Sequence, residues 1–154
     1  MLKAIVAALR AELATFTRAA QAARAEATDP QSRAEHKYDT RGLEASYLAA
    51  GQARQVAELE AALAAFAALP TRKFAADEAI ALGALVELEQ NGAADFYFLG
   101  PCAGGTEVKC GAHEILVITP QSPLGAQLQG RRSGDVIELQ LNGTKRRARI
   151  RSVQ

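Results

Sequence analysis

The sequence contains no tryptophan, only one methionine, two cysteines and two histidines among its 154 residues. Cys102 and Cys110 do not form a CxxC pair, and no second ligand pair accompanies them, so the sequence does not predict a zinc site. His36 and His113 also stand alone, with no Cys or His at ligand spacing. We find no Ser-His-Asp set, no phosphate-binding loop and no ligand set for a resident metal. The sequence therefore predicts no self-sufficient active site.

Long hydrophobic runs are missing as well. No apolar run approaches the roughly 18 to 20 residues that span a bilayer, and the N-terminus lacks a signal-peptide pattern. We therefore expect a cytoplasmic protein that does not contact a membrane. In that compartment Cys102 and Cys110 are expected to be free thiols, although a hairpin over the intervening glycines would bring them near each other.

Neither sign of charge dominates, since the sequence has 18 Lys and Arg residues and 17 Asp and Glu residues, and its net charge is +1. This balance neither demands nor excludes a nucleic-acid partner, so any such partner must be met by a local patch. Basic runs are typical of a solvated strand edge and would also steer docking to an acidic surface. They comprise Arg131, Arg132, Lys145, Arg146, Arg147, Arg149 and Arg151.

Alanine is unevenly distributed, with 23 in the first 70 residues and 11 in the remaining 84, which places a domain boundary near Pro70. The expected domains are 1–70 and 71–154. Two apolar series in the first domain follow the steps of four and three that are typical of a coiled coil. They are Leu2, Val6, Leu9, Leu13, Phe16, Ala20, Ala23 and Ala27, and then Ala45, Ala49, Gln52, Val56, Leu59, Leu63 and Phe66.

A polar stretch that contains Asp29 and Pro30 separates the two series and breaks the helix. The pattern predicts an antiparallel helical hairpin with its tip near residues 28–44. In the two apolar series, large side chains lie near the two chain ends of the hairpin and alanines lie near the bend. Because small side chains let two helices approach closely, we expect the hairpin to be thin near the bend. A helix of about 27 residues would reach roughly 40 Å. We expect Tyr38 and Tyr47 to pack across this hairpin rather than stack at its tip.

Beyond Lys73 the pattern changes to short strands, and Asn142-Gly143 predicts a hairpin turn between the last two. Ser122 is predicted to cap a short helix with Pro123 at its first position, and Leu124 and Leu128 would share one face of it. The fold class is therefore α+β: a coiled-coil hairpin followed by a small antiparallel sheet domain with one helix. The expected strands are 80–88, 96–99, 107–110, 115–118, 136–141 and 148–153.

The order of strand, Ser-Pro-Leu-Gly helix start, Gly-Asp turn and strand in 115–139 resembles the C-terminal domain of the bacterial Gre transcript-cleavage factors. The segment 38–48 resembles a Gre-related branch in which a helical hairpin precedes that domain. Together the two resemblances imply an FKBP-like C-terminal domain that docks on bacterial RNA polymerase. The implied polymerase-binding residues are Ser122, Pro123, Leu124 and Gly125.

The resemblance also implies that acidic side chains at the hairpin tip enter the secondary channel of RNA polymerase. There they would help to hold a Mg²⁺ ion at the polymerase's own active centre, so the chain would be a cofactor of RNA cleavage rather than an enzyme. Mg²⁺ keeps several waters and needs only one or two carboxylates from a visiting protein. Glu35 and Asp39, four residues apart, are the expected pair, and Glu44 is a third candidate.

The tip departs from the pattern of the cleavage-active factors, in which a Gly-Asp precedes a Glu-Asn and an acidic-Tyr pair; here Asp29-Pro30 precedes Glu35-His36. The tip acids therefore also fit solvated turn charges paired with Arg33, Lys37 and Arg41. A channel-binding regulator without cleavage stimulation is the alternative function.

Two further hypotheses come from other classes. An FKBP-like domain suggests prolyl isomerase activity, although the domain offers few aromatics for such a pocket: Phe74, Phe96, Tyr97 and Phe98. An interaction module that dimerises through the alanine-rich hairpin is the other hypothesis. For a Gre-like factor we expect a monomer that meets RNA only through the polymerase and requires no DNA. His113, which precedes a buried strand, is expected to be structural.

Overall fold

The computed structural model describes residues 1–28, 41–75, 77–141 and 144–154. These residues form two compact units. One unit is Ala7–Leu63, and the other combines Met1–Val6 with Ala64–Gln154. The second unit therefore contains the sheet together with the outer ends of both long helices. In the part of the chain that the structure describes, no helix is long and apolar enough to cross a membrane.

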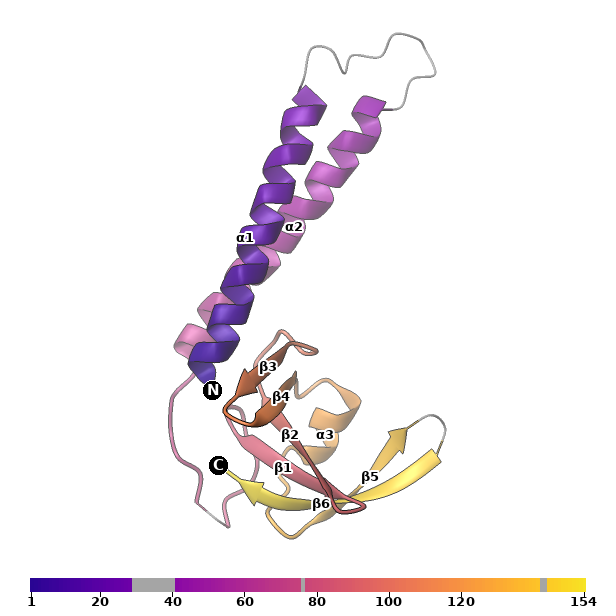
Figure 1. The fold of residues 1–154 in the computed structure, drawn as a ribbon. Helices are drawn as coiled ribbons and strands as arrows, with labels where there is room; N and C mark the ends of the chain where they lie inside the picture. The colour runs from indigo at the N-terminus through magenta and orange to yellow at the C-terminus, as the bar shows by residue number, and fades with distance from the viewer. Residues whose placement is uncertain (29–40, 76, 142–143) are drawn as a thin grey trace. The chain divides into compact units, whose positions relative to one another are not determined.

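The predicted helical hairpin is present as α1 (Leu2–Thr28) and α2 (Arg41–Ala68), which run in opposite directions (Figure 1). The expected series supplies most of the buried positions, but Ile5 and Ala62 are also buried. The buried strip is therefore wider than the two-position seam that the heptad pattern predicted. Its buried members are Ile5, Leu9, Ala23, Leu59, Ala62 and Phe66, of which Ile5 and Leu9 are fully buried.

The second unit is built on one six-stranded sheet with the strand order β3-β4-β2-β1-β6-β5. The short helix α3 (Pro123–Leu128) lies between β4 and β5 in sequence. The strands are β1 (Leu85–Gln90), β2 (Ala93–Leu99), β3 (Glu107–Cys110), β4 (His113–Ile118), β5 (Val136–Leu141) and β6 (Thr144–Val153).

The α+β class is confirmed, but the expectation of a purely antiparallel sheet is wrong for one pair of strands. β2 and β4 run parallel, with Phe96 opposite Ile115 and Leu99 opposite Ile118. The reason is topological. β3 and β4 form an antiparallel hairpin, and β4 lies between β3 and β2 in the sheet, where it runs in the same direction as β2. The run of β-branched and aliphatic residues in β4 is typical of such a covered parallel strand.

The bounds of β1, β2, β4 and β6 differ from the expectation, and at the start of β1 the reason is local. Residues 80–84 precede β1, because Gly83 adopts a positive φ of 92° and turns the chain just before the strand. Ile80 still exchanges backbone hydrogen bonds with Gly130 and Arg131, at 2.9 and 2.7 Å. The expected turn residues Asn142 and Gly143 lie outside the described residues, and β5 and β6 pair antiparallel on either side of them.

Apolar side chains cover one sheet face beneath α3, where Val86, Ile150 and Leu128 are fully buried. On the opposite face Phe98 is also fully buried, and the Phe66 ring of α2 stacks on it with centroids 6.3 Å apart. A Cβ atom at Gly100 would lie 3.0 Å from the Phe66 ring. The last turn of α2 therefore belongs to the core of the sheet unit.

Candidate functional site

The Ser-Pro helix start is a tightly bonded corner at the end of β4. Ser122 caps α3: its Oγ accepts a hydrogen bond from the Gly125 backbone N–H at 3.0 Å, and its hydroxyl donates to the Thr119 carbonyl at 2.7 Å. Pro123 occupies the first turn of α3, where a backbone N–H would have no partner within the helix, so its absence costs no hydrogen bond. The predicted cap is confirmed, and it fixes the direction in which α3 leaves the sheet.

Gly125 is required at this corner because the backbone approaches too closely for a side chain. A Cβ atom there would lie 1.9 Å from the Thr119 carbonyl oxygen. Leu124 is half-buried and packs on the core under α3, whereas Pro123 is exposed. The four residues Ser122 to Gly125 thus divide into three that build the corner and one, Pro123, that is presented at its surface.

Of the hairpin tip, the structure describes only Thr28 at the end of α1 and the first residues of α2. Glu35 and Asp39, the expected pair of acids, lie outside the described residues, as do Arg33, Lys37 and Tyr38. Glu44 lies in the first turn of α2 and is exposed. A carboxylate at a helix N-terminus is favoured by the helix dipole, so this position holds a negative charge without a cost to the helix.

Large apolar side chains surround Glu44 on the first two turns of α2. Leu43, Tyr47 and Leu48 are 57%, 71% and 53% exposed. The expectation that Tyr47 packs across the hairpin is therefore wrong. The reason is helical phase: the half-buried positions of this part of α2 are Ala49 and Gln52, which lie on the other side of the helix from Tyr47. Sequence reasoning missed this patch, although Leu43 and Tyr47 fall outside the seam series and their four-residue spacing could have indicated it.

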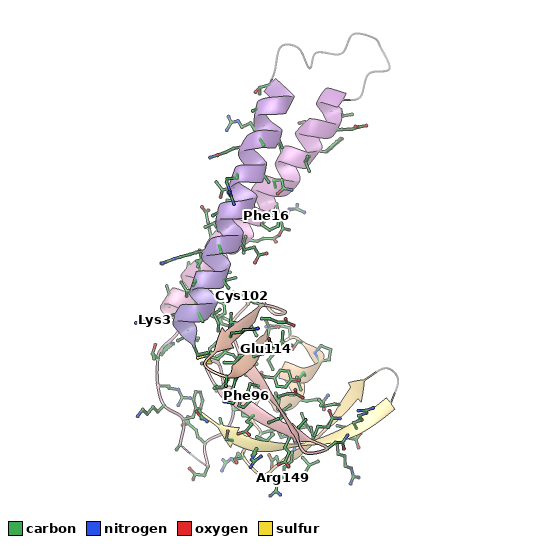
Figure 2. All side chains as sticks on the ribbon, in the orientation of Figure 1. Lys3, Phe16, Phe96, Cys102, Glu114 and Arg149 are labelled. Atoms are coloured by element: carbon green, nitrogen blue, oxygen red, sulfur yellow. The ribbon has the colours of Figure 1, made fainter. Side chains whose placement is uncertain are left out.

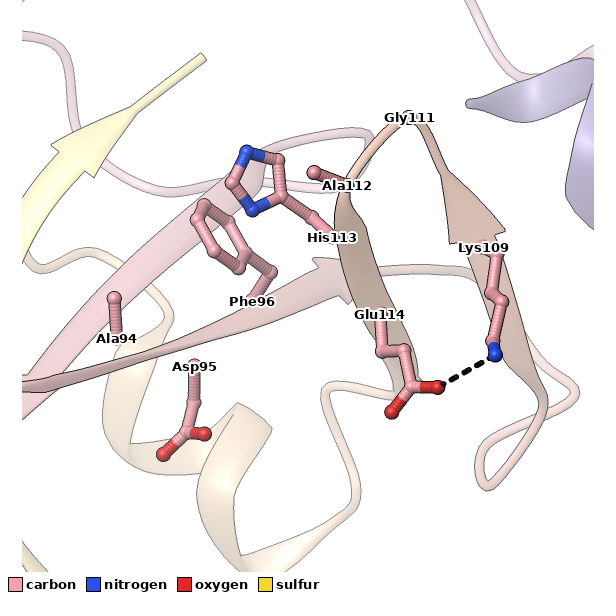
Figure 3. Close-up of a pocket in the computed structure, with 8 residues that line it drawn as sticks. All are labelled: Ala94, Asp95, Phe96, Lys109, Gly111, Ala112, His113 and Glu114. Atoms are coloured by element: carbon pink, nitrogen blue, oxygen red, sulfur yellow. Dashed lines mark ion pairs between the residues drawn. The ribbon is translucent and has the colours of Figure 1, made fainter.

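A shallow groove of about 510 Å³ lies where β2 and β4 begin (Figure 3). His113 stacks on Phe96 with ring centroids 4.2 Å apart, in keeping with its expected structural role. Asp95 and Glu114 also line the groove, and Glu114 pairs with Lys109 at 3.2 Å. In the described ranges, no group of three or more His, Cys, Asp or Glu side chains could hold a metal ion.

The two cysteines are free thiols and half-buried, as expected. Burial raises the pKa of the Cys102 thiol, because the thiolate is poorly solvated there. Since the thiolate is the reactive form, this shift makes Cys102 a weak nucleophile near neutral pH. Tyr97 has a raised pKa for the same reason, with the nearby Asp95 carboxylate adding to the effect. Neither group carries a catalytic signature.

These features define an architectural class, namely a two-helix hairpin followed by a small α+β sheet domain with a serine-capped helix at its corner. Solved structures of transcription factors match this chain. GreA factor homolog 1 of Thermus thermophilus is 25% identical, with 99% of this chain and 96% of that chain covered and a TM-score of 0.41. Gfh1 of Thermus aquaticus is 23% identical, with 99% and 95% covered and a TM-score of 0.43.

The transcription elongation factor GreA/GreB of Nitrosomonas europaea is 20% identical, with 62% of this chain and 78% of that chain covered and a TM-score of 0.37. The matches fall among the Gre-related proteins that the two sequence motifs resemble. No protein-family model and no curated protein matches the chain.

Proposed function

We propose that this chain is a Gre-related transcription factor that binds bacterial RNA polymerase with its C-terminal domain and inserts its helical hairpin into the secondary channel. The observation that carries the proposal is the Ser122–Gly125 corner. Its Ser-Pro-Leu-Gly sequence resembles that of the Gre C-terminal domain, and Pro123 is exposed on a corner that the Ser122 hydrogen bonds and the close backbone approach at Gly125 hold in place. A rigid, exposed corner is suited to docking because little conformational entropy is lost on binding.

The beginning of α2 supports the insertion of the hairpin. Leu43, Tyr47 and Leu48 expose apolar surface to water around the Glu44 carboxylate. Covering such surface in a partner's channel is favourable by roughly 25 cal/mol for each Å² removed from water. A purely structural helix of this kind would place polar residues at these positions. The patch therefore fits a segment that binds another molecule.

Stimulation of RNA cleavage is the first form of the proposed activity. Glu35, Asp39 and Glu44 would supply carboxylates to a Mg²⁺ ion shared with the polymerase. At such a site Mg²⁺ activates water and stabilises the leaving oxygen of a phosphodiester. An oxygen-only donor set suits Mg²⁺, which prefers hard ligands. The chain itself would then be a cofactor of the polymerase rather than an enzyme.

Regulation without cleavage is the second form, and the tip sequence favours it. Asp29-Pro30 stands where cleavage-active factors carry Gly-Asp, and Glu35 is followed by His36 rather than Asn. In this form the same docking and insertion occupy the channel, and the acids contact polymerase groups instead of completing a metal site. The two forms make the same prediction for binding and opposite predictions for RNA shortening.

A stalled, backtracked elongation complex separates the two forms. The full chain is added to it, alongside the variants Glu35→Ala, Asp39→Ala and Glu44→Ala, and both RNA length and polymerase binding are measured. Glu58→Ala is the matched control, because Glu58 is an exposed acid of the same helix more than three turns beyond Glu44. Shortened RNA that depends on a tip acid supports the cleavage form, and binding without shortening supports the regulator. A chain that fails to bind the polymerase contradicts both.

A further inference from the structure

A polar side chain lies in the seam, the strip along which α1 and α2 pack on each other. Gln52 is the one polar member of the two apolar series that mark this seam, and it is half-buried. Its Oε1 atom is buried and accepts no hydrogen bond from the described residues. A buried amide oxygen without a donor has given up its hydrogen bonds to water, so it destabilises the packed state. Close packing of the two helices is therefore disfavoured at Gln52.

The residue before Gln52 weakens the same turn of α2. Gly51 lies inside the helix, is exposed, and has no atom within 4 Å of its Cβ position. Neither a close contact nor a positive φ requires glycine there. Glycine in a helix interior loses more backbone entropy on folding than alanine does. Two destabilising residues, one acting through the backbone and one through its side chain, thus stand next to each other.

The side chains between the helices also change in size at this level. The last large member of the α1 series is Phe16, labelled in Figure 2, and the first large member of the α2 series is Val56. Phe16 lies about 18 Å from the end of α1, and Gln52 lies about 17 Å from the start of α2. Because the helices are antiparallel, these two residues are at similar levels. Toward the tip the two series contain only alanine, namely Ala20, Ala23, Ala27, Ala45 and Ala49.

The helices are held together more strongly on one side of this level than on the other. On the side of the chain ends, Leu9 and Leu59 are only 1% and 8% exposed. Toward the tip, Ala23 is the one buried residue among those whose side chains the structure describes. Burying an alanine methyl group stabilises a fold much less than burying a leucine side chain. The part of the hairpin beyond Gln52 is therefore weakly packed.

A polar seam residue can have a different role, which is to fix the pairing register of two helices. In that role its side chain would bond to a polar group across the seam, and the described residues offer Gln52 Oε1 no such group. Register also gives no reason for the glycine at position 51, which contacts nothing across the seam. The two residues together fit a point of low stability better than a register device.

We propose that Gly51 and Gln52 form a built-in weak point of α2, at which the distal part of the hairpin opens while the basal part stays folded. The distal part comprises residues 17–28 and 41–51, and the basal part comprises residues 7–16 and 52–63. The opening is a local separation of α1 from α2 within the Ala7–Leu63 unit. It is a property of the free chain and does not depend on binding to polymerase. It gives the end of the hairpin that carries Tyr47 a freedom of direction that a uniformly packed coiled coil lacks.

The test is native-state hydrogen exchange of the full chain, read by NMR at single amides over a range of low denaturant concentrations. We expect protection of distal amides to be lower than that of basal amides by about tenfold or more, with a step at Gly51 and Gln52. Exchange of distal amides should depend little on denaturant, because a local opening exposes little surface. Protection that declines evenly toward the tip, or distal amides that exchange only by global unfolding, would overturn the proposal.

Variants of the two residues identify the cause. Gln52→Leu should slow distal exchange by about tenfold or more, because it removes the unpaired amide from the seam. Gly51→Ala should slow it by about two- to fivefold. Gln55→Leu is the matched control, because Gln55 is exposed on the same helix and the same substitution there should leave distal exchange nearly unchanged. Equal slowing by the two leucine variants, or no slowing by Gln52→Leu, would show that the weak point is not at Gln52.

Discussion

Gly125 shows how a single residue fixes the proposed docking corner. The space that a side chain would need is occupied by the Thr119 carbonyl oxygen, 1.9 Å from an ideal Cβ. Gly125→Ala should therefore lower the free energy of unfolding by roughly 3 kcal/mol, through a displaced helix start. Chemical denaturation of the full chain measures this loss.

Gly51→Ala is the control for that prediction, and its effect should have the opposite sign. Gly51 lies within α2 with nothing within 4 Å of its Cβ position. Alanine is a better helix former than glycine, so the variant should gain about 0.5 to 1 kcal/mol. If both alanine variants change the free energy of unfolding in the same direction and by the same amount, the close approach of Thr119 does not explain why glycine stands at position 125.

The Glu78 carboxylate makes the stability of the fold depend on pH. Its pKa is lowered, first by the hydrogen bond from Arg72 and then by the Ala75 backbone N–H at 3.1 Å. Because the folded pKa lies below the ordinary value of 4.5, the charged form stabilises the fold above that pH. The stabilisation is lost as the pH falls through the lowered folded pKa.

Glu78→Gln should therefore destabilise the chain near pH 7, and the difference from the unmodified chain should shrink as the pH is lowered toward about 3. Denaturant midpoints across this range give the measurement. The double variant Arg72→Met with Glu78→Gln should lose less unfolding free energy than the sum of the two single variants, because each single change already removes the same Arg72–Glu78 interaction. A difference that stays constant with pH would show that the carboxylate charge is not the cause.

The last turn of α2 packs into the core of the sheet unit. Phe66 is 3% exposed and stacks on the fully buried Phe98. Phe66→Ala should cost about 3 to 5 kcal/mol of unfolding free energy, measured by denaturation. Phe16→Ala is the matched control: Phe16 is only half-buried in α1, so its loss should be clearly smaller. Equal losses would mean that the stack on the sheet contributes little.

Most elements could be predicted because their signals are local. The three-four spacing of the apolar series marks both long helices, and Ser122-Pro123 marks the start of α3 with its cap. β3 and β5 were predicted with the bounds that they have. The parallel pairing of β2 with β4 was missed, because it depends on which strands meet across the sheet rather than on the residues of either strand.

The candidate site was predicted less completely than the fold. The Ser122 cap follows from neighbouring residues, but the need for glycine at 125 depends on the carbonyl of Thr119, six residues away, which the pattern does not reveal. The exposure of Tyr47 depends on the phase of α2, which we misjudged. Glu35 and Asp39 lie outside the described residues, so their roles stay predictions.

The two compact units have separate roles in the proposed function. The sheet unit presents the Ser122–Gly125 corner for the proposed docking, and the Ala7–Leu63 unit carries the exposed Leu43, Glu44 and Tyr47 at one end of α2. In both forms of the proposal the chemistry belongs to the partner, and this chain supplies position and charge.

The most direct test of this account is a photo-crosslinking experiment on a stalled RNA polymerase elongation complex. A photoreactive residue replaces Tyr47 in one variant and Glu60 in another; the two sites are about 20 Å apart along α2. We predict that the Tyr47 probe crosslinks to the polymerase active centre or the RNA 3′ end, and that the Glu60 probe does not. Such a result would hold for either form of the proposed function. Crosslinks at neither site, or the same crosslinks from both, would contradict insertion of the hairpin.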